Sequence, residues 1–334
     1  MPVTLAQAKL NATDDVDVQI IDEFQKSNDV LNRLTFDDVV SGAGNGATLT
    51  YGYTRQITQR GAAFRAINSE YTPTEVTKQR YTVDLKPLGG SFQIDRVLNR
   101  VAQAAETAFQ MRELLKGTSA KFNDSFFNGD TAVDANGFDG LNKLLTGTAT
   151  EYLPVSNGVS TGYVDWTAVS SQSAAFQAIA HIDAWLGTLD GRPDAIYLPR
   201  KAKALFKVIA SYAGQYSIDR DSVGNVVESY NGIPLIDPGQ KDGSALDVLQ
   251  VVSRDTDGAG AGGTITGLAD LYAVRYGLDG VHGVAMAGQP LVSNWMPDFS
   301  TAGAVKTGEA ELGPVAVVVK KTKSAAVLRN VKVS

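Results

Sequence analysis

The stretch VLNRVAQAAETAFQMRELLKGTSAKFNDSFF, residues 97–127, predicts one long amphipathic helix. Its apolar and small side chains recur every three or four positions, the spacing that places them on one helical face. The positions on that face are Val97, Val101, Ala105, Ala108, Met111, Leu115, Phe122 and Phe126. The predicted helix has 31 residues, whereas a typical globular helix has about 11. At about 1.5 Å per residue it would be roughly 46 Å long. Residues 128–130, with the sequence NGD, form a stop signal that ends it.

Gly117 is the weak point of this predicted helix. Glycine in a helix interior costs up to about 1 kcal/mol relative to alanine because its backbone loses more freedom on folding. We therefore predict that the helix bends at Gly117 if it bends anywhere along its length.

Two extended runs precede the helix and indicate a projecting two-stranded ribbon. The first run covers residues 48–57, and the second covers residues 79–88, where Tyr81, Val83 and Leu85 alternate with polar residues. A two-stranded ribbon is marginally stable by itself in water. We expect it to lie on the surface of a partner, while a solvated hairpin on its own domain is also compatible with the pattern.

The segment between the two runs has no core pattern and carries an excess of basic groups. Charged side chains on such an extended segment are candidates for contacts between subunits. The candidates are Arg55, Arg60, Arg65, Glu70, Glu75, Lys78 and Arg80.

The rest of the chain describes a mixed unit and a strand-rich tail. Residues 129–141 form a turn rich in Asp and Gly, and residues 146–165 form a connector of low charge that marks a boundary. Helical and extended patterns alternate over residues 166–280, and residues 281–334 are rich in strand patterns with a basic end. The sequence therefore predicts an α+β fold with more than one structural unit.

Composition argues against several classes of function. The 334 residues carry a net charge of -6, which does not favour a protein that grips nucleic acid by neutralising phosphates. The chain has no cysteine, its two histidines are far apart in the sequence, and no serine lies in a G-x-S-x-G motif. No apolar run approaches 18 residues. We expect no catalytic residues, no cofactor, no metal and no membrane partner.

The order of these parts resembles the major capsid proteins of tailed bacteriophages with the Hong Kong 97 type of fold, which encapsulin nanocompartment shells share. The matching features are the acidic N-terminal segment, the extended loop at 46–92, the sequence FQID at 92–95 that leads into the long helix, and NGFDGL at 136–141. The later features are PDAIYL at 193–198, YNGIPL at 230–235 and ADLYAVRYG at 269–277. The resemblance covers nearly the whole chain.

The resemblance implies a division of the chain into four parts. Residues 1–45 would form an N-terminal arm and residues 46–92 the extended β-hairpin loop. Residues 93–145 and 281–334 would form a peripheral domain built on the spine helix, and residues 146–280 would form an axial domain.

The same resemblance implies a structural role. The chain would assemble with itself into the pentamers and hexamers of an icosahedral shell that encloses double-stranded DNA without sequence specificity. Portal and decoration proteins would be further partners, and any scaffold would be a separate protein or lie outside this sequence, which opens without a long helical leader. The protein would be part of the virion and would assemble in the cytoplasm of a host bacterium. Two alternatives stay open: an encapsulin-type compartment around a protein cargo, and an α/β enzyme that uses residues 166–280.

Overall fold

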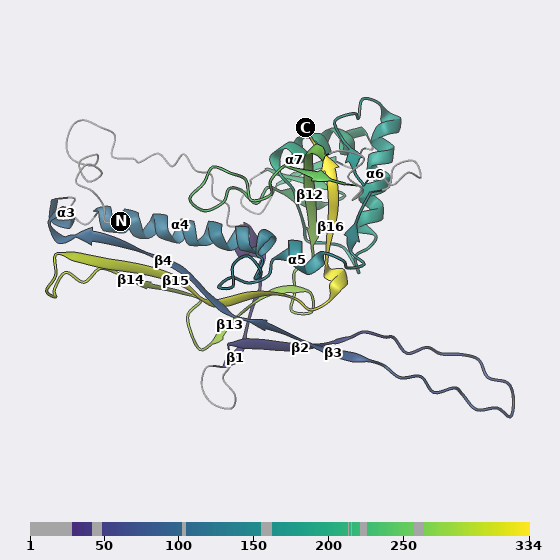
Figure 1. Cartoon of the computed structure of the whole chain (residues 1–334). Helices are drawn as coiled ribbons and strands as arrows, with labels where there is room; N and C mark the ends of the chain where they lie inside the picture. Colours follow the sequence, from purple (N-terminus) through teal and green to yellow (C-terminus); the bar gives the residue numbers. More distant parts are fainter. Residues whose placement is uncertain are drawn as a thin grey trace.

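The computed structural model describes residues 29–41, 49–101, 105–154, 162–212, 214, 216–220, 226–256 and 264–334. Most of the predicted N-terminal arm, residues 1–45, therefore lies outside the described residues. Figure 1 shows a long helix beside an extended sheet, a second unit around another sheet, and a ribbon that projects away from both.

The helices are α2 (Asp29–Arg33), α3 (Arg96–Val101), α4 (Ala105–Asn128), α5 (Leu141–Leu145), α6 (Gln172–Leu186) and α7 (Arg200–Tyr212), with a 3-10 turn at Thr322–Ser324. The predicted spine is helical in α3 and α4, and residues 102–104 between them lie outside the described residues. The predicted buried face is confirmed at Met111, Phe122 and Phe126. It is wrong at Val97 of α3 and at Ala108 near the start of α4, which are both exposed, whereas Glu106 is buried. The Glu106 carboxylate accepts a hydrogen bond from Gln110 Nε2 at 2.7 Å, which lowers the cost of burying it.

The first sheet has five strands, β1 (Phe36–Ser41), β13 (Val281–Ala287), β15 (Val305–Val319), β14 (Val292–Trp295) and β4 (Lys86–Asp95). The 15-residue strand β15 organises this sheet, since it pairs with β13 near its end and with β14 and β4 along its earlier part. Helix α4 packs along β4 and β15 (Figure 1). The long helix thus lies on one face of a long, narrow sheet.

The second sheet has nine strands. Its main path runs β5 (Glu151–Tyr152), β16 (Ala325–Lys332), β12 (Thr264–Val274), β7 (Ala195–Tyr197), β10 (Ile233–Ile236), β9 (Val226–Tyr230) and β8 (Tyr216–Arg220). Two further strands, β6 (Val164–Asp165) and β11 (Val252–Asp255), pair with β16 and β12. Helices α6 and α7 pack against this sheet through an apolar cluster that includes Ile182 and Phe206.

An aromatic cluster joins the spine helix to the second sheet. The Phe127 ring lies 5.1 Å from the Tyr197 ring of β7 and 5.4 Å from the Tyr272 ring of β12, measured between centroids. The Tyr197 hydroxyl is 2.7 Å from the Tyr276 hydroxyl, and it donates to Asp29 Oδ2 of α2 at 3.2 Å. Burial raises the pKa of Tyr197 far above its usual range, so this hydroxyl stays protonated. The C-terminal end of α4 is therefore fixed to the second unit.

Strand β16 differs from the predicted grouping of residues 281–334 with the spine helix. It lies in the nine-stranded sheet, where it pairs with β12, while β13 to β15 lie in the five-stranded sheet. Arg329 of β16 explains part of this placement. Its guanidinium lies 2.9 Å from Asp270 Oδ2 on β12 and 2.9 Å from Glu151 Oε1 on β5, and it also donates to Asn142 of α5. A buried side chain with these partners ties the last strand to the second unit.

The projecting ribbon is confirmed. Strands β2 (Thr50–Gln56) and β3 (Lys78–Asp84) form a two-stranded antiparallel sheet in which Tyr53 faces Tyr81. The second predicted run, residues 79–88, is divided between two strands, because β3 ends at Asp84 and Leu88 belongs to β4, where it pairs with Leu312. We call residues 49–85 the arm, which is distinct from the predicted N-terminal arm at 1–45. Strands β2 and β3 are its root, and residues 57–77 are its tip.

Candidate inter-subunit arm

The root of the arm is held against the end of β15 by one face of β2. Tyr51 is buried, and its ring packs edge-on against His282 of β13 with 6.0 Å between centroids. The Tyr53 hydroxyl donates to the Val319 carbonyl at 3.2 Å. Alternation along β2 places these two side chains, at positions two apart, on the same face of the strand. The root is thus directed by contacts within its own chain.

Arg55 completes this attachment. Its Nε donates to the Lys320 carbonyl at 2.9 Å, and its Nη2 donates to the Val319 carbonyl at 2.8 Å. The guanidinium carbon also lies 4.5 Å from the centre of the Tyr81 ring, and Tyr81 stacks on Tyr53. A planar guanidinium suits this double role of two parallel hydrogen bonds and an aromatic contact. Burial raises the pKa of Tyr53, although the neighbouring Arg55 charge opposes the rise.

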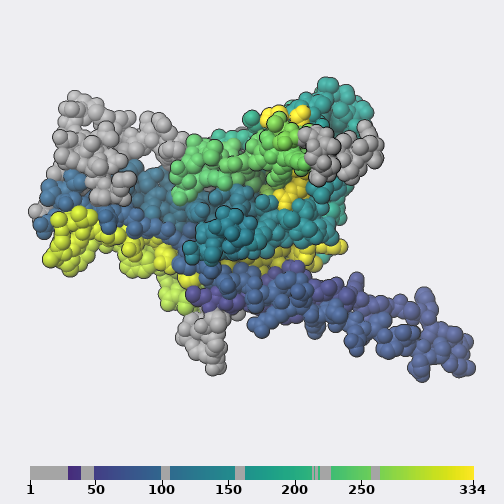
Figure 2. Space-filling view, viewed as in Figure 1, coloured from purple at the N-terminus to yellow at the C-terminus, as the bar shows by residue number. Residues whose placement is uncertain are grey.

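The tip of the arm exposes large apolar side chains and runs clear of the body (Figures 1 and 2). Phe64 is fully exposed, and Ile67 and Tyr71 are 91% and 63% exposed. Burying each such side chain contributes roughly 1.5–3 kcal/mol, so their exposure is unfavourable in water. Within the described residues the tip makes no contact with either sheet that could cover them. The tip is therefore the largest uncovered apolar feature of the arm.

A local turn shapes the tip. Asn68 has a positive φ of 68°, and the backbone N–H of Ser69 donates to the Ala66 carbonyl at 3.2 Å. Arg65 Nη1 donates to the Ser69 carbonyl at 3.2 Å, and its guanidinium carbon lies 5.3 Å from the centre of the Tyr71 ring. Asparagine tolerates the left-handed region better than most residues, which suits this turn. The apolar side chains are therefore presented on a partly ordered segment.

The structure separates the predicted contact residues into three groups. Arg55 is engaged within its own chain, as described above. Four residues lie exposed on the tip: Arg60, Arg65, Glu70 and Glu75. Lys78 and Arg80 are exposed on the root strand β3. The sequence reasoning missed Phe64, Ile67 and Tyr71, although three large apolar residues in a stretch without strand or helix periodicity were a visible signal.

Gly117 lies within the continuous helix α4. A Cβ placed on Gly117 would lie 2.9 Å from Asp242 Oδ1, which belongs to the loop after β10. The same loop bonds to α4 elsewhere, because Lys241 Nζ lies 3.2 Å from Asp124 Oδ1 and Asn128 Nδ2 donates to the Val248 carbonyl at 2.8 Å. Gly117 therefore sits where a loop of the second unit crosses the spine, and a bend there stays a prediction.

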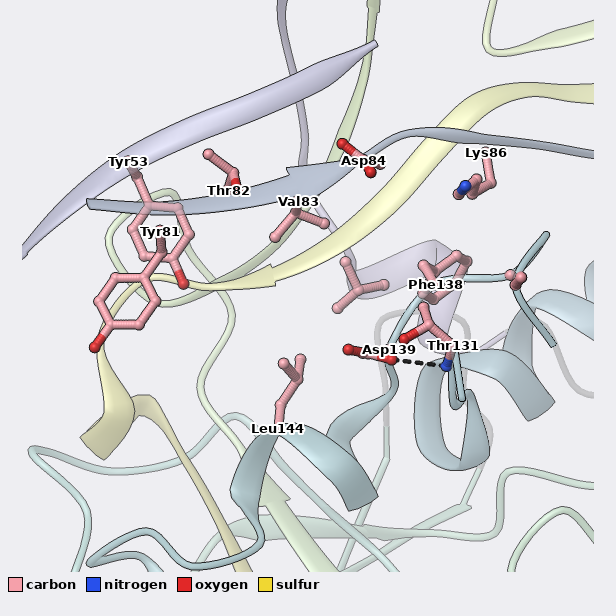
Figure 3. A pocket seen from close by; sticks show the side chains of 13 residues that line it. Tyr53, Tyr81, Thr82, Val83, Asp84, Lys86, Thr131, Phe138, Asp139 and Leu144 are labelled. Carbon is pink, nitrogen blue, oxygen red and sulfur yellow. Dashed lines mark hydrogen bonds between the residues drawn. The ribbon is translucent and has the colours of Figure 1, made fainter. Parts of the chain in front are cut away.

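A hollow of about 390 Å³ separates the arm root from the turn at 129–141 (Figure 3). Tyr53, Tyr81 and Val83 line it from the arm, and Phe138 and Asp139 line it from the turn. Asp139 Oδ1 accepts the Thr131 N–H at 2.8 Å and lies 2.9 Å from Lys143 Nζ. Burial alone would raise the pKa of Asp139, but these hydrogen bonds outweigh it and lower the pKa. The hollow therefore has a mixed lining of aromatic, aliphatic and charged side chains.

No group of three or more histidine, cysteine, aspartate or glutamate side chains gathers in a way that could hold a metal ion in the part of the chain the structure describes. Within the same residues, no helix is both long enough and apolar enough to cross a membrane.

A second exposed apolar group lies at the other end of the molecule. Val292 and Trp295 of β14, the adjacent Met296, and Val305 at the start of β15 are about half exposed. Figure 1 shows β14 and the arm pointing toward opposite ends of the molecule. We call these four residues the sheet-end patch. The chain therefore carries apolar surface at both extremes of its long dimension.

The comparisons with known proteins rest on structure. No protein-family model and no curated protein matches the chain. The SrpI encapsulin complex from Synechococcus elongatus PCC 7942 is 14% identical with a TM-score of 0.60, over 100% of this chain and 98% of that chain. A structure from Mycobacterium phage Bobi is 14% identical with a TM-score of 0.58, over 100% of both chains. The capsid of Myoviridae phage XM1 is 13% identical with a TM-score of 0.52, over 98% of this chain and 99% of that chain.

These similarities cover the whole length of the chains compared, so they concern the architecture as a whole and not one motif. The chain has the Hong Kong 97 type of major capsid fold, an α+β fold with a long spine helix and an extended β-hairpin loop. The resemblance in fold that the order of sequence features predicted is confirmed.

Proposed function

We propose that the chain is a structural, non-enzymatic major capsid protein whose copies assemble into the icosahedral head shell of a tailed bacteriophage. The shell encloses double-stranded DNA. Its copies form hexamers and pentamers in the cytoplasm of the host bacterium and remain in the virion. Separate scaffold, portal and decoration proteins are further partners.

The exposed apolar tip of the arm is the observation that carries this proposal. Phe64, Ile67 and Tyr71 stay in water in the single chain, and the root directs them away from the body. Covering them on a second copy recovers free energy that the single chain does not gain. The arm therefore becomes stable in its extended form only when a neighbour lies beneath it.

The positions of the two apolar surfaces are compatible with head-to-tail assembly. The arm tip and the sheet-end patch are different surfaces at opposite ends of one chain, so contacts that use either of them need not be symmetric about a two-fold axis. Head-to-tail contacts of this type close into rings when the rotation between neighbours allows it. Rings of five and six copies are the units from which a closed shell is built.

The charge of the chain is compatible with a wall around DNA. A net charge of -6 disfavours tight binding of the packaged phosphates to the shell as a whole. Contacts with DNA would then be few and independent of sequence. An encapsulin-type shell around a protein cargo is the second candidate, and the similarity to the SrpI encapsulin over the full chain supports it.

Sedimentation and electron microscopy of the purified chain test the proposal. We expect closed particles of uniform size, in equilibrium with smaller rings. A chain that stays a monomer of 35.4 kDa at every ionic strength, pH and protein concentration tried would exclude both shell functions. Particles isolated from the native source and treated with nuclease then separate the two candidates, because protected DNA supports the capsid and a protein cargo without DNA supports the compartment.

A further inference from the structure

A buried histidine lies directly under the root of the arm. His282 belongs to β13, which pairs with β1 on one side and with β15 on the other. Its side chain is completely buried, and no group in the described residues makes a good hydrogen bond to either ring nitrogen. Leaving buried polar atoms without a well-placed hydrogen bond is unfavourable. Among the described residues, the aromatic ring that packs edge-on against this imidazole is that of Tyr51 of β2, with 6.0 Å between centroids.

Charged groups lie near this histidine on β1, on β2, directly after β15 and before β13. From the end of β15 comes Lys320, whose Nζ lies 5.4 Å from the centre of the Tyr51 ring. From β1 comes Asp37, whose Oδ2 lies 3.9 Å from Lys320 Nζ and accepts the Tyr51 hydroxyl at 3.5 Å. Arg55 on β2 bonds to the Lys320 carbonyl, and Asp279, before β13, is paired with Arg275 at 2.9 Å. Lys320 and Asp37 therefore form a cation–anion pair close enough to influence this histidine.

These surroundings favour the neutral form of His282. Burial and then the Lys320 charge lower its pKa, and the backbone of Gly280 with Asp37 and Asp279 offsets the shift only in part. A histidine with a lowered folded pKa destabilises the folded state in acid, because the unfolded chain takes up the proton first. The loss begins as the pH falls below about 6.5, the ordinary histidine pKa, and it grows until the pH reaches the folded pKa.

The arm root is the part of this site that can open most easily. Strand β13 is paired on both sides within a five-stranded sheet. Among the described residues, strand β2 pairs only with β3, and it meets the body through Tyr51, Tyr53 and Arg55. Local opening takes place where few buried contacts must be broken. A proton on His282 would place a second cation beside Lys320 and under Tyr51, so the contact of Tyr51 would be lost first.

We propose that His282 is a pH-sensitive contact that controls the arm, so that protonation of its imidazole loosens β2 from β13 and β15 and frees the arm to change direction. This property belongs to the single chain. If the arm does not respond to pH, the proposed shell function still stands. If the chain does not form shells, the pH response of the arm can still be present.

Hydrogen exchange of the unassembled full-length chain tests the proposal. Exchange rates are measured between pH 7.5 and pH 5.0 and corrected for their intrinsic pH dependence. We expect the amides of β2 and β3 to exchange at least tenfold faster at pH 5.0, while those of β12 and β16 change little. No change in the arm, or an equal change in all strands, would overturn the proposal.

The chain offers a matched control because it has only two histidines. His181 of α6 lies in the other unit, where its Nδ1 is 3.0 Å from the Tyr152 hydroxyl. We expect His282→Gln to abolish the acid response of the arm and His181→Gln to retain it. The same response in His282→Gln as in the wild type would count against the proposal.

A second measurement covers the case in which His282→Gln does not fold. In the wild-type chain with labelled histidines, nuclear magnetic resonance gives two ring signals, which His181→Gln assigns. The midpoint of the His282 titration should coincide with the midpoint of arm exchange, and Lys320→Met should move both to higher pH. Midpoints that differ by more than one pH unit would refute the link between this histidine and the arm.

Discussion

Gly117 of the spine helix faces Asp242 of the loop after β10 so closely that a Cβ on Gly117 would lie 2.9 Å from the Asp242 carboxylate. Real Cβ atoms are almost never that close to a neighbour, although the neighbour here is the end of an exposed, flexible side chain. Glycine at this position therefore has two explanations. It can provide clearance for the crossing loop, or it can allow the helix to bend.

Two substitutions separate these explanations. Gly117→Ala should stabilise the helix by up to about 1 kcal/mol through helix propensity, and contact with Asp242 should remove part of that gain. In an Asp242→Ala background the full gain should return, as measured by urea unfolding of the unassembled chain. If glycine is needed to leave room for Asp242, Gly117→Ala alters particle size only when Asp242 is present. If bending is the reason, Gly117→Ala alters particle size in both backgrounds.

Arg55 should set the direction of the arm through its planar guanidinium. Arg55→Lys keeps the charge but cannot donate to two carbonyls and stack on Tyr81 at once. We expect about tenfold faster hydrogen exchange in β2 and β3 of the unassembled chain. Arg80→Lys on the exposed face of β3 is the matched control and should leave exchange unchanged. Equal effects of the two substitutions would show that Arg55 has no special role.

Arg60 and Arg65 on the arm tip should act in assembly and not in folding. Both are exposed, and in the single chain neither contacts the sheets among the described residues. Arg60→Glu with Arg65→Glu should lower the yield of particles at least tenfold, because charges of the wrong sign would face the neighbouring copy. The melting temperature of the unassembled chain should not change. Lys201→Glu on α7 reverses one charge at an exposed position away from the arm, and an equal loss of particles in that variant would contradict a specific role.

Asp270 should make the second unit sensitive to acid. Arg254 donates to both of its carboxylate oxygens at 2.7 Å, and Arg329 Nη1 donates to Oδ2 at 2.9 Å. Burial alone would raise the pKa of Asp270, but the two guanidinium groups outweigh burial and lower it. Its contribution to stability is therefore complete above pH about 3.9, the ordinary aspartate pKa, and is lost as the pH falls through the lowered folded value.

The variant Asp270→Asn measures this contribution. At pH 7 it should lower the free energy of unfolding by about 3–5 kcal/mol, because two arginines lose their buried counterion. The difference from the wild type should shrink below pH 4. Glu113→Gln, which breaks the solvent-exposed pair with Lys116, should cost at most about 0.5 kcal/mol. A difference for Asp270→Asn that is constant from pH 7 to pH 2 would contradict the role of its charge.

The sequence predicted most accurately the elements whose pattern is local. The three-or-four spacing of Met111, Phe122 and Phe126 appears as the buried face of α4. The alternation of Tyr81 and Val83 with the polar Thr82 appears as strand β3. Each of these patterns lies within one element, so no knowledge of distant residues was needed to detect it. The order of such elements was enough to indicate the fold.

The partners of these elements depend on contacts between distant parts of the chain. The sequence did not show that β16 leaves the sheet of β15 for the sheet of β12, because a strand that begins with four apolar residues, Ala325 to Leu328, fits the centre of either. It also did not show that Arg55 bonds to the end of β15, since those residues are more than 260 positions apart.

The sequence by itself therefore determined a long helix, a two-stranded ribbon before it and a mixed unit after it, because periodicity and turn signals are properties of neighbouring residues. The tertiary structure alone decided what each of these touches. It placed Asp242 against Gly117, the buried His282 against Tyr51, and three exposed apolar side chains at the tip of the arm. Burial and pairing are set by the whole chain, since only the folded arrangement decides which surfaces lose contact with water.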